Sequence, residues 1–198
     1  MSEPPSPGVT LATRSTIARP TETGFTGIYV HWDGYPSNHL PLLLAAHQHR
    51  FAGDTDALAA HLIDSPAVGW NSLGEDLLDG APDEVRQHVV GPHGGPGPSS
   101  TIDNMFTLDG SPAERMTCNE AAAGQGWLQW AYVLHPHGIE VLPLSETVTG
   151  SVVAWDQDPM TVFPDDVRAW LPGRRTPPAT TVRKPAPVST APVKSVRR

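Results

Sequence analysis

The spacing of apolar residues in the first half of the chain predicts one strand followed by several helices. Residues 25–32 concentrate aromatic and β-branched side chains, which favour a β-strand. Leucine, histidine and phenylalanine then recur at helical spacing through residues 40–51, so we expect a helix there. Asp54 is a typical N-cap residue and predicts a second helix through residue 64. A proline followed by two acidic residues predicts a further short helix over residues 82–89.

The second half of the chain changes to apolar runs that predict strands. Residues 127–135 and 138–144 flank the sequence His-Pro-His-Gly and predict a β-hairpin, and residues 147–155 predict a third strand. A last helix is expected over residues 164–171, because proline opens it and two acidic residues suit a helix N-terminus. Together these elements predict an α+β domain with a small, mostly antiparallel sheet and several short helices.

Both ends of the chain have the composition of segments that do not fold. Residues 1–22 contain four prolines and are expected to form a disordered tail. Residues 173–198 contain five prolines and no aromatic residue, so they cannot bury enough apolar surface to offset the entropy of ordering. Residues 91–100, with the sequence GPHGGPGPSS, predict a flexible loop. The predicted folded domain therefore covers residues 23–172.

Charge is divided unevenly between the predicted domain and its C-terminal tail. Residues 1–172 hold all 21 acidic residues and a net charge of −15, whereas residues 173–198 hold seven basic residues and no acid. An acidic domain repels phosphate and complements the basic surface of another protein. The tail leaves two alternatives open. It either binds nucleic acid as a basic arm, or it solubilises the chain and folds back weakly on the acidic domain.

Several classes of protein are excluded or disfavoured by what the sequence lacks. No apolar run approaches the roughly 20 residues that a membrane span needs, so we expect no membrane partner. The first 20 residues contain no apolar secretory segment, so a cytoplasmic location is expected. A single cysteine, Cys118, allows no internal disulfide and is expected to be a small buried residue. No nucleophile elbow, P-loop, dinucleotide fingerprint or zinc-protease motif is present.

The residues best suited to metal binding or acid–base chemistry lie at the end of the first predicted strand. On a strand, His31 and Asp33 would project to the same face, where they could ligate a divalent metal or form an acid–base pair. His47, on the next helix, could complete a set of two histidines and one carboxylate, with His61 as an alternative third ligand. The simpler interpretation is structural: Asp33 begins a turn, His31 hydrogen-bonds to it, and His47 is a core histidine.

Residues 28–36, IYVHWDGYP, carry a resemblance to known proteins. They resemble a signature of small uncharacterised proteins from bacteria, phages and plasmids, with the pattern Tyr-x-His-x-Asp-Gly-Tyr-Pro. The likeness extends over about residues 27–144, through the predicted hairpin. It departs after Pro36, where Ser37-Asn38-His39 replaces a step that contains glycine. The resemblance implies no particular reaction, and it implies the context of a mobile genetic element.

Three functions are compatible with these patterns. The first is a non-enzymatic accessory protein whose acidic domain binds another protein, and the lack of any catalytic template favours it. The second is a metal-dependent hydrolase or nuclease that uses His31 and Asp33, with His47 as a third ligand. The third is a nucleic-acid binder that acts through residues 173–198. We expect the first, and therefore a protein that is not an enzyme.

Overall fold

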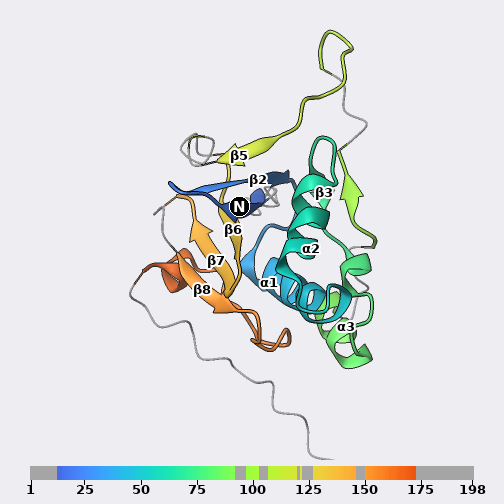
Figure 1. The fold of residues 1–198 in the computed structure, drawn as a ribbon, viewed down its shortest axis with the longest axis vertical. Helices are drawn as coiled ribbons and strands as arrows, with labels where there is room; N and C mark the ends of the chain where they lie inside the picture. Colours follow the sequence, from blue (N-terminus) through green and yellow to red (C-terminus); the bar gives the residue numbers. More distant parts are fainter. Residues whose placement is uncertain are drawn as a thin grey trace, which may run out of the picture.

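A mixed, mostly antiparallel sheet runs through the fold, with the helices α1 to α3 packed on one side of it (Figure 1). The computed structural model describes residues 13–91, 97–102, 107–119, 121, 127–145 and 150–172. Within these residues the sheet has eight strands in the order β4-β3-β2-β1-β6-β7-β8, and β5 pairs with β2 outside this path. The strands are β1 (Ser15–Pro20), β2 (Phe25–Val30), β3 (Trp70–Ser72), β4 (Ser100–Thr101), β5 (Thr117–Asn119), β6 (Trp130–His135), β7 (Gly138–Pro143) and β8 (Ser151–Ala154).

Short helices follow β2 and build most of the second layer. They are α1 (Pro36–Ala45), the π-helix η1 (Ala46–Arg50), α2 (Thr55–Ala59), the π-helix η2 (Ala60–Asp64), the 3-10 helix η3 (Glu75–Leu78), α3 (Asp83–Val90) and the 3-10 helix η4 (Val167–Trp170). Residues 39–46 of α1 and η1 are all buried, because α1 lies between the sheet and the other helices. The predicted cap is confirmed: the Asp54 carboxylate accepts a hydrogen bond from the Ala57 amide.

The core follows the alternation of side chains along the strands. Ile17, Ile28 and Tyr132 point to the helical side and join the leucines of α1 in the main core. Ala18 and Val133, each next to one of these residues in sequence, point to the opposite face and belong to a smaller cluster. The sheet is therefore apolar on both faces in its centre, as strands covered on both sides must be.

The N-terminal end of the domain corrects the sequence analysis. Residues 15–20, predicted to lie in a disordered tail over residues 1–22, form β1, which pairs with β2 antiparallel and with β6 parallel. The hydrophobic signal of β1 is weak because Ser15 and Thr16 are buried polar residues. Thr16 satisfies its hydroxyl by donating a 2.9 Å hydrogen bond to the carbonyl of Ile28. Residues 1–12 lie outside the described part of the chain.

The remaining predicted elements are confirmed with changed boundaries. The predicted hairpin is β6 and β7, and the strand predicted over residues 147–155 is the shorter β8. The helix predicted over residues 82–89 is α3, and the last predicted helix is the short 3-10 helix η4. The basic tail over residues 173–198 and residues 92–96 of the loop predicted over residues 91–100 lie outside the described residues. None of the helices in the described segments is long and apolar enough to cross a membrane.

Candidate functional site

Residues 31–35, which join β2 to α1, are held in place by backbone hydrogen bonds, and we call them the docking loop. The amides of His31 and Trp32 donate hydrogen bonds of 3.0 Å to the carbonyls of residues 70 and 71 in β3. The amide of Gly34 donates a 2.9 Å bond to the Thr13 carbonyl, next to β1. The loop is therefore fixed to β3 and to the segment that precedes β1.

Gly34 is required because the loop presses directly against β1. A Cβ atom at position 34 would lie 2.7 Å from the Ser15 side chain and 2.7 Å from the Thr13 carbonyl. The Gly34 carbonyl accepts a 2.8 Å hydrogen bond from the hydroxyl of Tyr132 in β6. This close packing restricts the backbone conformation of the loop.

Asp33 does not share a face with His31 in the way that strand alternation predicts. The strand β2 ends at Val30, and Asp33 adopts a left-handed backbone with φ of 58°. Its carbonyl accepts a 3.0 Å hydrogen bond from the side-chain amide of Asn38, which closes the turn. The structure therefore places Asp33 in a turn, as the simpler interpretation proposed, but the hydrogen-bond partner of His31 is Tyr29.

Two aromatic residues of the docking loop project into solvent. Trp32 is 41% exposed and Tyr35 is 40% exposed, and they are the only exposed tryptophan or tyrosine side chains among the described residues. The other aromatic residues of the described chain are buried or partly buried in the core clusters. Trp32 and Tyr35 therefore offer aromatic contact area on the surface of one loop.

A polar and aromatic cluster adjoins Trp32 at the end of β2. The Tyr29 hydroxyl and the Nδ1 atom of His31 are 2.7 Å apart, and the His31 ring meets the Trp32 ring edge to face at 4.6 Å. Trp127 lies against Tyr29, with ring centroids 5.3 Å apart. Burial lowers the pKa of His31, and the nearby charge of Arg14 lowers it further, so the imidazole is neutral at pH 7.

A shallow groove of about 170 Å³ begins just beyond the docking loop. It is lined by Ser37, Asn38, Pro41, His88, Val89, Thr161, Val162 and Phe163. Ser37 donates two hydrogen bonds to the Asp165 carboxylate, from its amide at 2.9 Å and from its hydroxyl at 2.8 Å. Val162 is 55% exposed and supplies part of the apolar lining of this groove.

The residues proposed as metal ligands are not brought together. His47 packs in the helical layer, where its ring stacks on Trp155 at 4.0 Å and its Nε2 atom lies 3.1 Å from the Thr55 hydroxyl. The alternative ligand His61 contacts the rings of Phe51 and Trp70. In the described parts of the chain, no three His, Cys, Asp or Glu side chains are placed to hold a metal ion.

His39 is a buried histidine that the sequence analysis did not single out. It is fully buried behind the docking loop, where its Nε2 atom lies 3.3 Å from the Ser15 hydroxyl and its ring lies 5.1 Å from that of Tyr132. Burial lowers its pKa to about 4. Ser15 is buried too, so this hydroxyl–imidazole pair is closed to any substrate and serves the packing of the loop.

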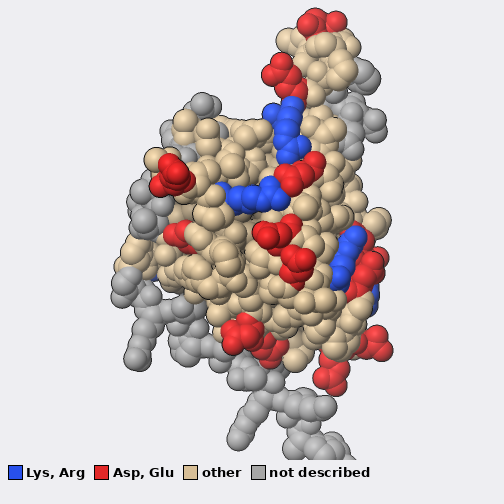
Figure 2. Space-filling view, viewed as in Figure 1, with Lys and Arg blue, Asp and Glu red and all other residues tan. Residues whose placement is uncertain are grey.

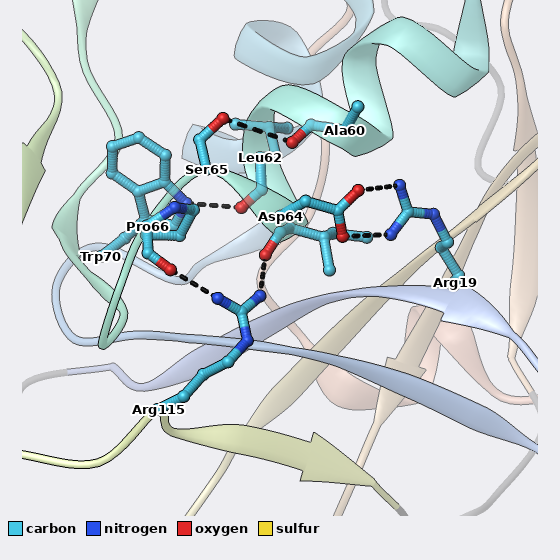
Figure 3. A network of polar contacts seen from close by, with 9 residues as sticks. Arg19, Ala60, Leu62, Asp64, Ser65, Pro66, Trp70 and Arg115 are labelled. Atoms are coloured by element: carbon cyan, nitrogen blue, oxygen red, sulfur yellow. Dashed lines mark hydrogen bonds and ion pairs between the residues drawn. The ribbon is translucent and has the colours of Figure 1, made fainter.

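Arginine side chains link the helical segments to the sheet, to neighbouring loops and to one another. Arg19 of β1 binds the Asp64 carboxylate through two hydrogen bonds of 2.8 Å (Figure 3). Arg115 reaches the carbonyls of Ile63 and Pro66 in the same network. Arg50 binds Asp76 at 3.1 Å. These arginines are used within the fold.

Carboxylates dominate the charged surface of the domain. In the face shown in Figure 2, acidic side chains are spread over much of the surface and basic ones lie between some of them. Three arginines of the described residues, Arg19, Arg50 and Arg86, are paired with aspartates. The sequence of residues 1–172 has a net charge of −15. No protein family, curated protein or solved structure matches this chain.

Proposed function

We propose that this chain is a non-enzymatic accessory protein whose acidic domain binds a basic surface of another protein through the docking loop. The observation that carries the proposal is the exposure of Trp32 and Tyr35 on a loop that the sheet holds in one conformation. The resemblance of residues 28–36 to proteins of phages and plasmids adds the context of a mobile genetic element.

Exposed aromatic residues on a rigid loop have the properties of a binding hot spot. Tryptophan and tyrosine are enriched among the residues that dominate protein–protein binding energy. A loop that is already ordered loses little conformational entropy on binding, so more of the contact energy becomes affinity. Trp32 and Tyr35 meet both conditions, because backbone hydrogen bonds fix the loop on either side of them.

The charge around the loop favours a basic partner. Asp33 lies between the two aromatic residues, and Asp165 lies beside the groove that follows them. An arginine or lysine of the partner can stack on the face of Trp32 while it approaches the Asp33 carboxylate. The net charge of the domain attracts the same partner over a longer distance and makes association sensitive to salt.

Affinity capture with matched variants tests the proposal. The wild-type chain, the double variant Trp32→Ala/Tyr35→Ala and the control Val152→Ala are each used to capture proteins from cells that carry the native gene. Val152 is a suitable control because it is an exposed apolar residue, 39% accessible, on the edge strand β8. We expect one basic protein to be captured by the wild type and by Val152→Ala, and to be lost with the double variant. If the double variant captures the same proteins as the wild type, the proposal is contradicted.

A further inference from the structure

The last described residues bring the chain back beside the groove that follows the docking loop. The Nε1 atom of Trp170 donates a 2.8 Å hydrogen bond to the carbonyl of Pro164, and the centroid of its ring lies 6.3 Å from that of Phe163. Phe163 is one of the residues that line the groove. The described chain ends at Pro172, two residues after Trp170, so the basic tail over residues 173–198 begins next to this groove.

The chain leaves η4 in the conformation that proline-rich segments adopt. Leu171, which follows η4, has φ of −68° and ψ of 145°, the values of a polyproline II helix. Pro172 comes next, and the pair Pro177 and Pro178 lies a few residues further on. Proline-rich segments bind grooves lined by aromatic side chains, because their extended backbone loses little conformational entropy on binding.

The groove combines an apolar lining with a neighbouring carboxylate. Its apolar residues include Val89 of α3, Val162 and Phe163, and none of the residues that line it is an arginine or a lysine. The exposed Asp165 carboxylate lies at its side, where it accepts two hydrogen bonds from Ser37 of the lining. A carboxylate has about four acceptor positions, so it can bind a guanidinium as well. This lining suits a ligand that has both prolines and arginines.

We propose that residues 174–178, Arg-Arg-Thr-Pro-Pro, bind in the groove of their own domain. The proline pair packs against Val162 and Phe163, and the arginine pair approaches the Asp165 carboxylate. Five residues separate the second proline of the described end from the first of the pair, and an extended chain of that length covers about 15 Å. The inference goes beyond the proposed function and does not depend on it, because none of the residues that line the groove belongs to the docking loop.

Charge and attachment both favour the chain's own tail as the occupant. The tail carries seven basic residues and no acid, whereas residues 1–172 have a net charge of −15. A segment joined to its site by a short linker has an effective concentration in roughly the millimolar range, so weak contacts suffice to occupy a shallow groove. Binding here holds the first basic residues of the tail on the acidic domain, which is one of the two roles that its composition allows.

Paired proline variants of the full chain test the contact by NMR. Pro177→Ala/Pro178→Ala changes the pair that enters the groove, and Pro185→Ala/Pro187→Ala changes a pair further along the same tail. We expect the first double variant to shift the amide and methyl resonances of Val89, which is distant in sequence, and the second to leave them unchanged. Resonances of Val89 that respond to neither pair, or equally to both, would overturn the proposal.

Two variants that each add one positive charge at an exposed valine test the groove itself. Val162→Lys places the charge in the groove, and Val152→Lys places it on the edge strand β8. The ¹⁵N–¹H heteronuclear NOE of Ala179 reports how firmly the residue after the proline pair is held. We expect it to fall in Val162→Lys and to keep its wild-type value in Val152→Lys. Equal values in the two lysine variants would overturn the proposal.

A mixture of isotope-labelled and unlabelled full chains identifies the occupant. Isotope-filtered spectra separate NOEs within a chain from those between chains, and we expect NOEs from Pro177 to the Phe163 ring within one chain. Their absence would overturn the proposal, and the same NOEs found only between chains would assign the groove to the tail of a second copy instead. These samples contain no partner protein, so failure here leaves the docking loop untouched, and failure of the capture experiment leaves the groove untouched.

Discussion

The hydroxyl of Tyr132 donates a 2.8 Å hydrogen bond to the carbonyl of Gly34, which lies 98 positions earlier in the chain. Burial raises the pKa of Tyr132 well above its ordinary value, so the hydroxyl stays protonated and donates throughout the physiological range. This bond connects the central strand β6 to the docking loop. The conformation of the exposed loop is thereby determined by the core of the sheet.

Gly34→Ala is expected to destabilise the domain by about 2 kcal/mol, because the added methyl group overlaps Ser15 and the Thr13 carbonyl. The control Gly53→Ala meets nothing within 4 Å, and only its positive φ opposes it, so we expect a loss of about 1 kcal/mol. Urea denaturation measures both free energies of unfolding. A Gly34→Ala variant as stable as the wild type would show that the loop is not packed against β1.

The stability of the domain is expected to fall as the pH drops from 6.5 toward 4, in part because of His39. Burial lowers the pKa of His39 to about 4, so over this interval the unfolded chain binds a proton that the folded chain does not. Stability from this residue is complete above pH 6.5, and at pH 4 about 3 kcal/mol of it is lost. Denaturation curves of wild type and His39→Gln across this range test the prediction. The variant should show a shallower dependence on pH, and identical slopes would contradict it.

Two aspartates that bind arginine are expected to differ in their contribution to stability. Asp64 is largely exposed, so Asp64→Asn should cost at most about 1 kcal/mol, and salt should reduce that cost. Asp76 is partly buried and binds both Arg50 and the Ser99 amide, so Asp76→Asn should cost about 2 kcal/mol. Burial raises the pKa of Asp76, but the bonds from Ser99 and Arg50 outweigh burial and hold it below its ordinary value. Equal losses in the two variants, measured by urea denaturation, would contradict this ranking.

The hairpin and the first helices could be predicted because their signals are local. β6 and β7 are neighbours in sequence, and Asp54 caps its helix within one turn. β1 could not be predicted in the same way. Its first two residues, Ser15 and Thr16, are polar but buried, so the hairpin that it forms with the neighbouring β2 carries a weak hydrophobic signal. Its second partner, β6, lies more than 100 residues away.

The sequence also predicts only part of the site, because the rest depends on contacts between segments that are distant in sequence. His31 could be singled out from the sequence as a candidate, but its contacts depend on where the strand ends and on how distant strands align. Asp33 leaves the predicted face because the chain turns after Val30. No local pattern reports this turn, so the spacing of His31 and Asp33 indicated a metal pair where the fold builds a turn.

Removal of divalent metals is expected to leave the stability of the domain unchanged. His31 is bound to Tyr29 and His47 lies against Thr55 and Trp155, and in the described residues no three His, Cys, Asp or Glu side chains are placed to hold a metal ion. Thermal unfolding with and without EDTA, together with elemental analysis of the wild type and His31→Ala, measures this. A stoichiometric metal that disappears in His31→Ala would restore the metal-dependent alternative.

Deletion of residues 173–198 is expected to abolish any affinity for DNA and to leave partner binding intact. The tail carries seven basic residues without an acid, whereas the remaining chain has a charge of −15 and repels phosphate. Fluorescence anisotropy with a labelled duplex at two salt concentrations measures the first effect, and affinity capture measures the second. DNA binding that survives the deletion would move the nucleic-acid site to the acidic domain and contradict the charge argument.

Photocrosslinking from the docking loop tests the central claim most directly. p-Benzoylphenylalanine is placed at position 32 or 35, and at position 152 as a control, and the cells are irradiated. If the docking loop contacts a partner, one basic protein is crosslinked from positions 32 and 35 and not from position 152. Crosslinks that are absent from both loop positions, or that form equally from position 152, would contradict the account.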